Sequence, residues 1–220
     1  MTPSRRSVLA AGAAGGLALG AGCLDVVSGE EPLEFAADRV EPAEATVADT
    51  GYESRGSERA SIDRTVDAGL EREVRASIWQ SVYSKTREHR GEDREVSLFA
   101  AVSTPEMAVA GRSVNPLADA SSEELLAEIL DRVDGPHGDL DGLERERSFV
   151  LEILGAGREV DVFAGETDLD GERVGVDVLI ASFDHEGDFL VTVGTHPTLL
   201  AEESANLELL MESLEHPLEG

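Results

Sequence analysis

The sequence predicts an α+β domain, in which an antiparallel sheet that includes a meander is flanked by a few amphipathic helices. Two observations support this fold class. After residue 140, short apolar segments are separated by turns that contain glycine, a pattern typical of consecutive antiparallel strands. Two other segments, one after Ser121 and one near the end of the chain, repeat their apolar residues at helical spacing.

The domain is expected to begin with a strand and a short helix. Leu33 and Phe35 alternate with polar residues within residues 33–40, as in a half-buried strand. Pro42 suits the start of a helix. Gly51 suits its end, because glycine readily adopts the left-handed conformation that ends many helices.

A hairpin and a further strand are expected next. The arms of the hairpin are predicted at residues 62–66 and 74–83, around a turn at 67–69, and the further strand at 96–103. The wholly polar residues 86–93 are predicted to form a loop. In the second arm, four aliphatic side chains share one face of the strand, namely Val74, Ala76, Ile78 and Val82.

The clearest predicted helix begins at Ser121. Ser121 and Glu124 have the spacing of a capping box, in which each side chain accepts a hydrogen bond from the backbone N–H of the other residue. Residues 134–136 read Asp-Gly-Pro and are expected to end the helix. Its apolar side is formed by Leu126, Ile129, Leu130 and Val133.

The rest of the chain is predicted to be a meander followed by a final helix. The four strands are expected at residues 148–154, 160–166, 174–183 and 189–193, because turn sequences with glycine separate them. The helix is expected at about 203–215. It would bury Leu207, Leu210, Met211 and Leu214 against the sheet.

The N-terminal residues resemble an export signal with a lipid-attachment site. Arg5 and Arg6 precede the uncharged segment 8–21, which has the length of a signal-peptide core and is short for a membrane-spanning helix. Small residues then lead to Cys23, the single cysteine of the chain. The stretch resembles a twin-arginine lipoprotein signal of the haloarchaeal kind. It departs from the usual pattern at Gly20, where a larger aliphatic residue is expected.

These features divide the chain into three parts. Residues 1–22 are predicted to be the signal peptide, 23–32 an acidic tether, and 33–220 a single domain. A lipid on Cys23 would hold the domain to the membrane on its extracytoplasmic face. It would also leave no cysteine for a disulfide or for thiol catalysis.

The charge of the chain is strongly negative. Residues 1–22 contain two of the 18 bases and none of the 46 acids, so the remainder carries 16 bases against 46 acids, a net charge of −30. Such a charge disfavours nucleic acid as a partner. Scarce lysine and few aromatic residues accompany it, and the acids are spread along the chain. Together these features are typical of a halophile's protein, whose surface charges are screened by molar salt.

Four stretches of the domain carry a family resemblance. They lie at residues 50–53, 76–79, 99–105 and 111–117, and the Ser-Thr-Pro and Gly-Arg-x-x-Asn-Pro sequences within the last two are the most specific. On these stretches the chain resembles a family of haloarchaeal lipoproteins that has no assigned function. The resemblance implies no catalytic residues. The order of meander, Pro197 and last helix is also similar to PsbP-like domains, which implies a fold and no activity.

The sequence contains no strong catalytic or cofactor motif. No two of its five histidines have the spacing of a helical zinc site, and no cofactor is expected. Two turns contain the Asp-x-Asp-Gly fragment of calcium loops, but each lacks the further ligands of a full loop and is better interpreted as an ordinary turn. The candidate calcium ligands in these turns are Asp139, Asp141, Asp168 and Asp170.

Two smaller features have a functional and a structural interpretation. Trp79 and Tyr83 share a strand face with Arg75, which suits either a stacking platform for a ligand or, preferably, a face packed in the core. Asn115 precedes a proline and suits either surface recognition or, preferably, the start of a turn.

Three functions are consistent with these observations. The leading interpretation is a lipid-anchored surface protein that binds a protein or small-molecule partner without catalysis. The alternatives are a hydrolase whose site no motif reveals, and a one-lobed ligand-capturing component of a transport system. An open apolar pocket would favour ligand capture, whereas a closed core would favour interaction with another protein.

Overall fold

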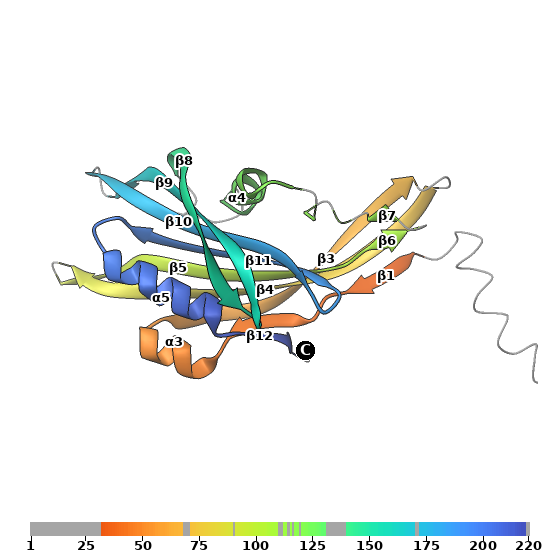
Figure 1. Ribbon diagram of the computed structural model, residues 1–220, viewed down its shortest axis with the longest axis horizontal. Coiled ribbons are helices and arrows are strands. Elements are labelled where there is room, and N and C mark those ends of the chain that lie inside the picture. Colours follow the sequence, from red (N-terminus) through yellow and green to blue (C-terminus); the bar gives the residue numbers. More distant parts are fainter. Residues whose placement is uncertain are drawn as a thin grey trace, which may run out of the picture.

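One large, twisted β-sheet forms the centre of the protein (Figure 1). The three helices of the described residues lie against it, and no helix among those residues is long and apolar enough to cross a membrane. The computed structural model describes residues 32–67, 71–89, 91–109, 112–113, 115, 117–118, 120–130, 140–169 and 172–218.

The sheet contains eight strands within these residues. Their order is β1-β4-β5-β11-β10-β9-β8, and β3 pairs with the other edge of β4. The short β1 pairs with β4 in parallel, and every other pair is antiparallel. The strands are β1 (Leu33–Ala36), β3 (Glu53–Asp67), β4 (Glu71–His89), β5 (Glu92–Pro105), β8 (Asp141–Ile153), β9 (Ala156–Leu169), β10 (Glu172–His185) and β11 (Asp188–Pro197).

The predicted fold class is therefore wrong. The protein is mostly β, built on one large mixed sheet, and is neither a meander flanked by amphipathic helices nor a PsbP-like arrangement. Part of the reason lies in residues 86–93, whose polarity indicated a loop. Residues 86–89 instead continue β4, and β5 starts at Glu92 after a turn that contains Gly91. Backbone hydrogen bonds hold such a hairpin whatever its side chains, so a strand exposed to solvent can be wholly polar.

Helices α3 (Glu44–Thr50) and α5 (Ala201–Glu212) cover one face of the sheet, together with the small pair of strands β2 (Arg39–Pro42) and β12 (Leu214–Leu218). The core on this face includes Phe99 and Leu179 from the sheet and Leu207 from α5. Leu207 lies so close to Gly194 of β11 that a Cβ there would come within 2.7 Å of its side chain. A glycine is therefore needed where α5 crosses the sheet.

A buried ion-pair network joins α5 to β4. Glu203 is fully buried, and its carboxylate lies 2.9 Å from Lys85 Nζ and 2.7 Å from Arg87 Nη2. Asn206 Nδ2 donates a further hydrogen bond of 2.8 Å to Glu203 Oε2. Burying a carboxylate away from water destabilises the folded protein unless several hydrogen-bond donors surround it. Lys85, Arg87 and Asn206 together supply these donors.

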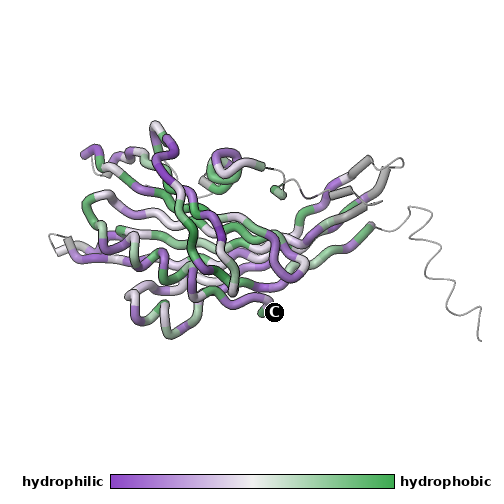
Figure 2. Tube along the Cα trace, viewed as in Figure 1, coloured by the Kyte–Doolittle hydropathy of each residue, from purple (hydrophilic) through white to green (hydrophobic). Residues whose placement is uncertain are grey.

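Helix α4 (Ser122–Leu130) covers part of the opposite face of the sheet. It packs on β9, β10 and β11, where Phe163, Val178 and Ile180 are buried. The predicted end of this helix, and with it Val133, lies outside the described residues. Both faces of the sheet carry apolar side chains, because consecutive residues of β10 enter opposite cores: Leu179 the core with α5, and Val178 and Ile180 the core with α4. Figure 2 shows hydrophobic residues in all the long strands of the sheet.

The predicted signal and lipid-attachment residues Arg5, Arg6, Gly20 and Cys23 also lie outside the described residues, and the three-part division of the chain stays a prediction. A second small pair of strands, β6 (Ala108–Val109) and β7 (Arg112–Ser113), follows β5.

Candidate ligand-binding groove

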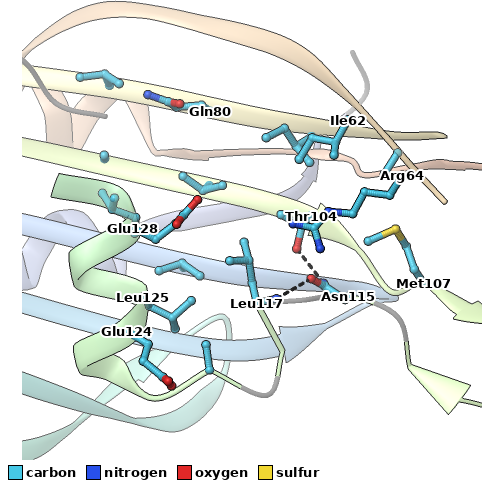
Figure 3. A pocket seen from close by; sticks show the side chains of 18 of the residues that line it. Ile62, Arg64, Gln80, Thr104, Met107, Asn115, Leu117, Glu124, Leu125 and Glu128 are labelled. Atoms are coloured by element: carbon cyan, nitrogen blue, oxygen red, sulfur yellow. Dashed lines mark hydrogen bonds between the residues drawn. The ribbon is translucent and has the colours of Figure 1, made fainter. Parts of the chain in front are cut away.

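An open groove of about 630 Å³ lies between α4 and the part of the sheet that α4 does not cover (Figure 3). Its floor is formed by β3, β4, β5 and one residue of β11. Its far wall is formed by α4 and the segment that precedes it. The lining residues that carry the arguments below are Ile78, Val82, Val102, Thr104, Asn115 and Leu125.

The floor is mainly aliphatic, with Gln80 as a polar side chain between Ile78 and Val82 of β4. Val74, Ala76, Ile78 and Val82 of β4 all line the groove, which confirms that they share one face. From Val74 to Val82 this row covers eight residue steps, or about 26 Å at the rise of an extended strand. Leu98, Ala100 and Val102 of β5 form a second row beside it.

The floor is only partly buried, although it belongs to the central strands. Ile62, Ile78, Val82, Leu98 and Val102 are all intermediate in exposure. Val191 and Val193, which pair with β5 residues Val102 and Ala100, are by contrast buried in the core that includes α4. Helix α4 therefore covers one part of a mainly apolar face and leaves the other part uncovered.

The capping box holds the first turn of the α4 wall. Ser121 N–H donates to Glu124 Oε2 at 2.8 Å, and Glu124 N–H donates to Ser121 Oγ at 3.3 Å, as the sequence predicted. The first of these bonds lowers the pKa of the Glu124 carboxyl below its usual value, because it favours the charged form. Ser122 Oγ also donates to Asp161 Oδ2 at 2.7 Å, which ties the start of the helix to β9.

Asn115 fixes one end of the groove. Its Nδ2 donates to Thr104 Oγ1 at 2.9 Å and to the Pro105 carbonyl at 3.3 Å, and its Oδ1 accepts from Leu117 N–H at 3.0 Å. Thr104 in turn donates to the Phe189 carbonyl at 3.2 Å. Asn115 is 4% exposed, so these bonds are shielded from water. The interpretation of Asn115 as a turn residue is confirmed, and the turn shapes a pocket wall.

The family of the chain follows from a match over residues 39–215, most of its length, to the model of a domain of unknown function, DUF6517. The chain belongs to the DUF6517 family. The predicted resemblance to a family without an assigned function is confirmed at this level.

Two solved structures are distantly similar to the DUF6517 domain. LpqN, involved in cell envelope biogenesis of Mycobacterium tuberculosis, is 9% identical, with 76% of this chain and 92% of LpqN covered and a TM-score of 0.28. PA94 of Pseudomonas aeruginosa, a protein of unknown function, is 11% identical over 56% of this chain and 94% of its own, with a TM-score of 0.24. Neither likeness bears on the argument. No curated protein matches the chain.

The aromatic face of β4 lies on the side of the DUF6517 sheet opposite to the groove. Tyr83 is buried against Phe99, with ring centroids 6.3 Å apart, and its burial raises the pKa of its hydroxyl to about 12. Trp79 lies beneath the Arg39 guanidinium at 6.0 Å from the ring centroid. Arg75 instead pairs with Asp63 at 2.7 Å. The three residues do not form a ligand platform, and the core interpretation holds for Tyr83.

The two candidate calcium turns are only partly described in the DUF6517 structure. Asp168 lies near the end of β9, and Asp141 begins β8 with its carboxylate 3.8 Å from Arg173 Nη2. Asp139 and Asp170 lie outside the described residues. Within the described part of the chain, no three His, Cys, Asp or Glu side chains lie together as metal ligands would.

A buried polar cluster around Asp188 escaped the sequence analysis. Its Oδ2 lies 3.0 Å from His216 Nε2 and accepts hydrogen bonds from Ser103 Oγ at 3.0 Å and Asp38 N–H at 2.7 Å. All three groups meet at one carboxylate oxygen, so the serine is not aligned with the histidine as a nucleophile would be. The cluster joins β5, β11, β12 and the segment between β1 and β2. No motif could have predicted it, since its members are far apart in the chain.

Proposed function

We propose that the DUF6517 domain binds an amphiphilic small molecule by enclosing one aliphatic chain of it in the groove. The groove itself carries the proposal: about 630 Å³, largely preformed and lined mainly by aliphatic side chains. Ligand pockets of small molecules commonly have this size and character. A surface for a protein partner would be larger and flatter.

The lining favours an alkyl chain over a flat ring. No aromatic side chain is among the described residues that line the groove, so a ring would find no stacking partner. The row on β4 from Val74 to Val82, aliphatic except for Gln80, runs for about 26 Å. One leaflet of a bilayer core is about 15 Å thick, half of the whole. The row is thus long enough to cover a complete lipid tail.

Three polar residues at the groove are already engaged in structure. Asn115 and Thr104 bond to each other, and Glu124 caps α4. These bonds hold the walls in place and supply a defined shape, which lowers the cost of ordering a ligand. They support a binding function. Catalysis is the alternative function, and it would be recognised by the formation of a product from the bound molecule.

We place this binding domain on the extracytoplasmic face of the membrane, attached through a lipid on Cys23. Leu33, the first residue of β1, pairs with Val74 in the groove floor. Ten residue steps separate Cys23 from Leu33 and can span at most about 35 Å. A lipid anchor would therefore keep the groove close to the membrane surface, where amphiphiles are concentrated.

Ligand binding is testable with a neutral single-chain amphiphile. Dodecyl maltoside, added in molar NaCl below the concentration at which it forms micelles, is expected to bind one molecule per chain in isothermal titration calorimetry. The full-length Cys23→Ser chain avoids competition from an attached lipid. Ile78→Gln is expected to weaken the affinity about tenfold, because it removes apolar area from the centre of the floor.

Val150→Gln is the matched control for this change. Val150 is 71% exposed on the edge strand β8, outside the groove, so its replacement removes a similar apolar side chain without touching the ligand. Equal weakening by both variants would show that dodecyl maltoside adsorbs to apolar surface in general. Thermal unfolding of both variants checks that they remain folded.

The anchor is testable by fractionation. The wild-type chain expressed in a haloarchaeal host is expected in the membrane fraction, and the Cys23→Ser chain is expected in the soluble fraction, because the thioether lipid is lost. A Cys23→Ser chain that stays in the membrane after washing in molar salt would contradict the lipid anchor.

A further inference from the structure

We infer that the groove selects amphiphiles with an anionic head group, and that Arg64 binds this head. The inference rests on the proposed function, since the aliphatic chain supplies the main contact. It adds a class of ligand and an orientation, with the head beside Arg64 and the tail along β4.

Arg64 stands at the edge of the aliphatic floor. It lies on β3, pairs in register with Val74 of β4, and shares the face of Ile62, which also lines the groove. Figure 3 shows its side chain extending from β3 across the floor toward Thr104 and Asn115. The backbone of Arg64 thus lies beside the apolar floor, and its guanidinium group lies over one end of that floor.

Arg64 has no partner among the residues that the structure describes. This is unusual in a chain with 46 acids and 18 bases, where an acid is seldom far from a base. The described arginines that pair with carboxylates within 3.0 Å are Arg55, Arg75, Arg87, Arg145 and Arg173. An unpaired guanidinium over an apolar floor is complementary to the head of an anionic amphiphile, since its planar fork donates hydrogen bonds to phosphate or carboxylate oxygens.

The acids of the groove do not offer an equivalent site for a cationic head. Glu124 and Glu128 lie on the α4 wall, across the groove from β3 (Figure 3). Glu124 already accepts the Ser121 N–H of the capping box, and Glu128 is engaged as well. Their negative charge also disfavours an anionic head on that side. The head is therefore directed to the Arg64 end, and the tail runs toward Val82 and Leu98.

Head-group selection is measured with three dodecyl amphiphiles that share one tail. The full-length Cys23→Ser chain is titrated in molar NaCl with dodecyl phosphate, dodecyl maltoside and dodecyltrimethylammonium, each below its micelle-forming concentration. Dodecyl phosphate is expected to bind about tenfold more tightly than the maltoside, the effect of one charge-assisted contact. The cationic amphiphile is expected to bind most weakly. Inorganic phosphate alone is expected not to bind measurably.

Arg64→Gln and Arg59→Gln separate the specific contact from the general charge. Arg59 lies on the same strand, is exposed, and likewise lacks a partner among the described residues, but it faces away from the groove. Arg64→Gln is expected to remove the tenfold preference for dodecyl phosphate over dodecyl maltoside, so that the two affinities become equal. Arg59→Gln is expected to keep the preference.

Each other outcome overturns a definite part of the argument. Equal affinity for dodecyl phosphate and dodecyl maltoside contradicts the head-group inference but leaves the proposed function standing. Tightest binding of dodecyltrimethylammonium places the head at the acids of α4 and also contradicts it. Binding of inorganic phosphate alone would make Arg64 part of a free-phosphate site. If none of the three amphiphiles binds, the proposed function fails together with the inference.

Discussion

Replacing Lys85 with methionine is expected to lower the free energy of unfolding by about 3 kcal/mol, because it removes one partner of a buried ion pair. Lys85 is the only lysine of the chain, and its Nζ lies 2.9 Å from the carboxylate of Glu203, which has no exposed surface. Methionine keeps much of the length of the side chain but leaves the buried carboxylate with fewer donors. Urea unfolding in molar NaCl measures the loss.

Two further variants test the cause of this loss. Arg75→Met breaks an ion pair of 2.7 Å with Asp63, but both side chains are about half exposed or more, so a loss below about 1 kcal/mol is expected. The double variant Lys85→Met/Glu203→Leu removes the stranded carboxylate and is expected to regain part of the stability lost by Lys85→Met alone. A double variant less stable than both single variants would show that packing, and not the buried charge, determines the effect.

Local signals in the sequence predicted several elements well. The capping box of Ser121 and Glu124 predicted the start of α4, because both of its hydrogen bonds form within four consecutive residues. Alternation also placed strands in the right parts of the chain. The bounds were too narrow where strands run on through polar residues, as β4 does to His89 and β8 does from Asp141. In those segments backbone hydrogen bonds hold the strands together, and the side chains show no alternation of apolar and polar residues that could predict a strand.

The groove could be predicted only in part. The row from Val74 to Val82 was recognised as one face of a strand, but a pattern along one strand does not say what lies above it. The groove exists because α4 packs on β9, β10 and β11 and stops short of β4. That placement depends on contacts between residues far apart in the chain. The aromatic residues Trp79 and Tyr83 instead suggested a ligand platform on the opposite face of β4, where Tyr83 is buried in the core.

The buried charges were beyond prediction for the same reason. Lys85 and Glu203 are 118 residues apart, and Asp188 meets Ser103 across 85 residues. Each looks like an ordinary surface residue in the sequence, since charged residues are buried only when partners surround them. Only the pairing of β5 with β11 and the crossing of α5 bring these partners together.

Transfer from molar NaCl to dilute buffer is expected to lower the midpoint of thermal unfolding by on the order of 10 °C, the equivalent of a few kcal/mol for a chain of this size. The chain carries a formal net charge of −28. At about 0.1 M salt the screening length is about 10 Å, and at 1 M it is about 3 Å. Repulsion between neighbouring carboxylates therefore acts in dilute buffer and is largely removed in molar salt.

The sheet shows where this repulsion arises. Glu88 of β4 lies directly opposite Asp93 of β5, and both side chains are exposed. Like charges in this position destabilise a strand pair. Asp141 and Glu166 also face each other, but there Arg173 lies 3.8 and 2.9 Å from the two carboxylates and offsets their repulsion. Glu88→Gln is accordingly expected to raise the midpoint in dilute buffer and to change it little in molar NaCl.

Sucrose distinguishes charge screening from a general stabilising effect of solutes. It strengthens the burial of apolar surface because it is excluded from the protein, but it does not screen charges. If repulsion sets the low-salt stability, sucrose raises the midpoints of the wild-type chain and the Glu88→Gln chain equally and leaves the difference between them intact, whereas NaCl removes that difference. Two results would contradict charge screening as the cause: a difference between the two chains that persists in molar NaCl, or a midpoint of thermal unfolding that does not change with salt.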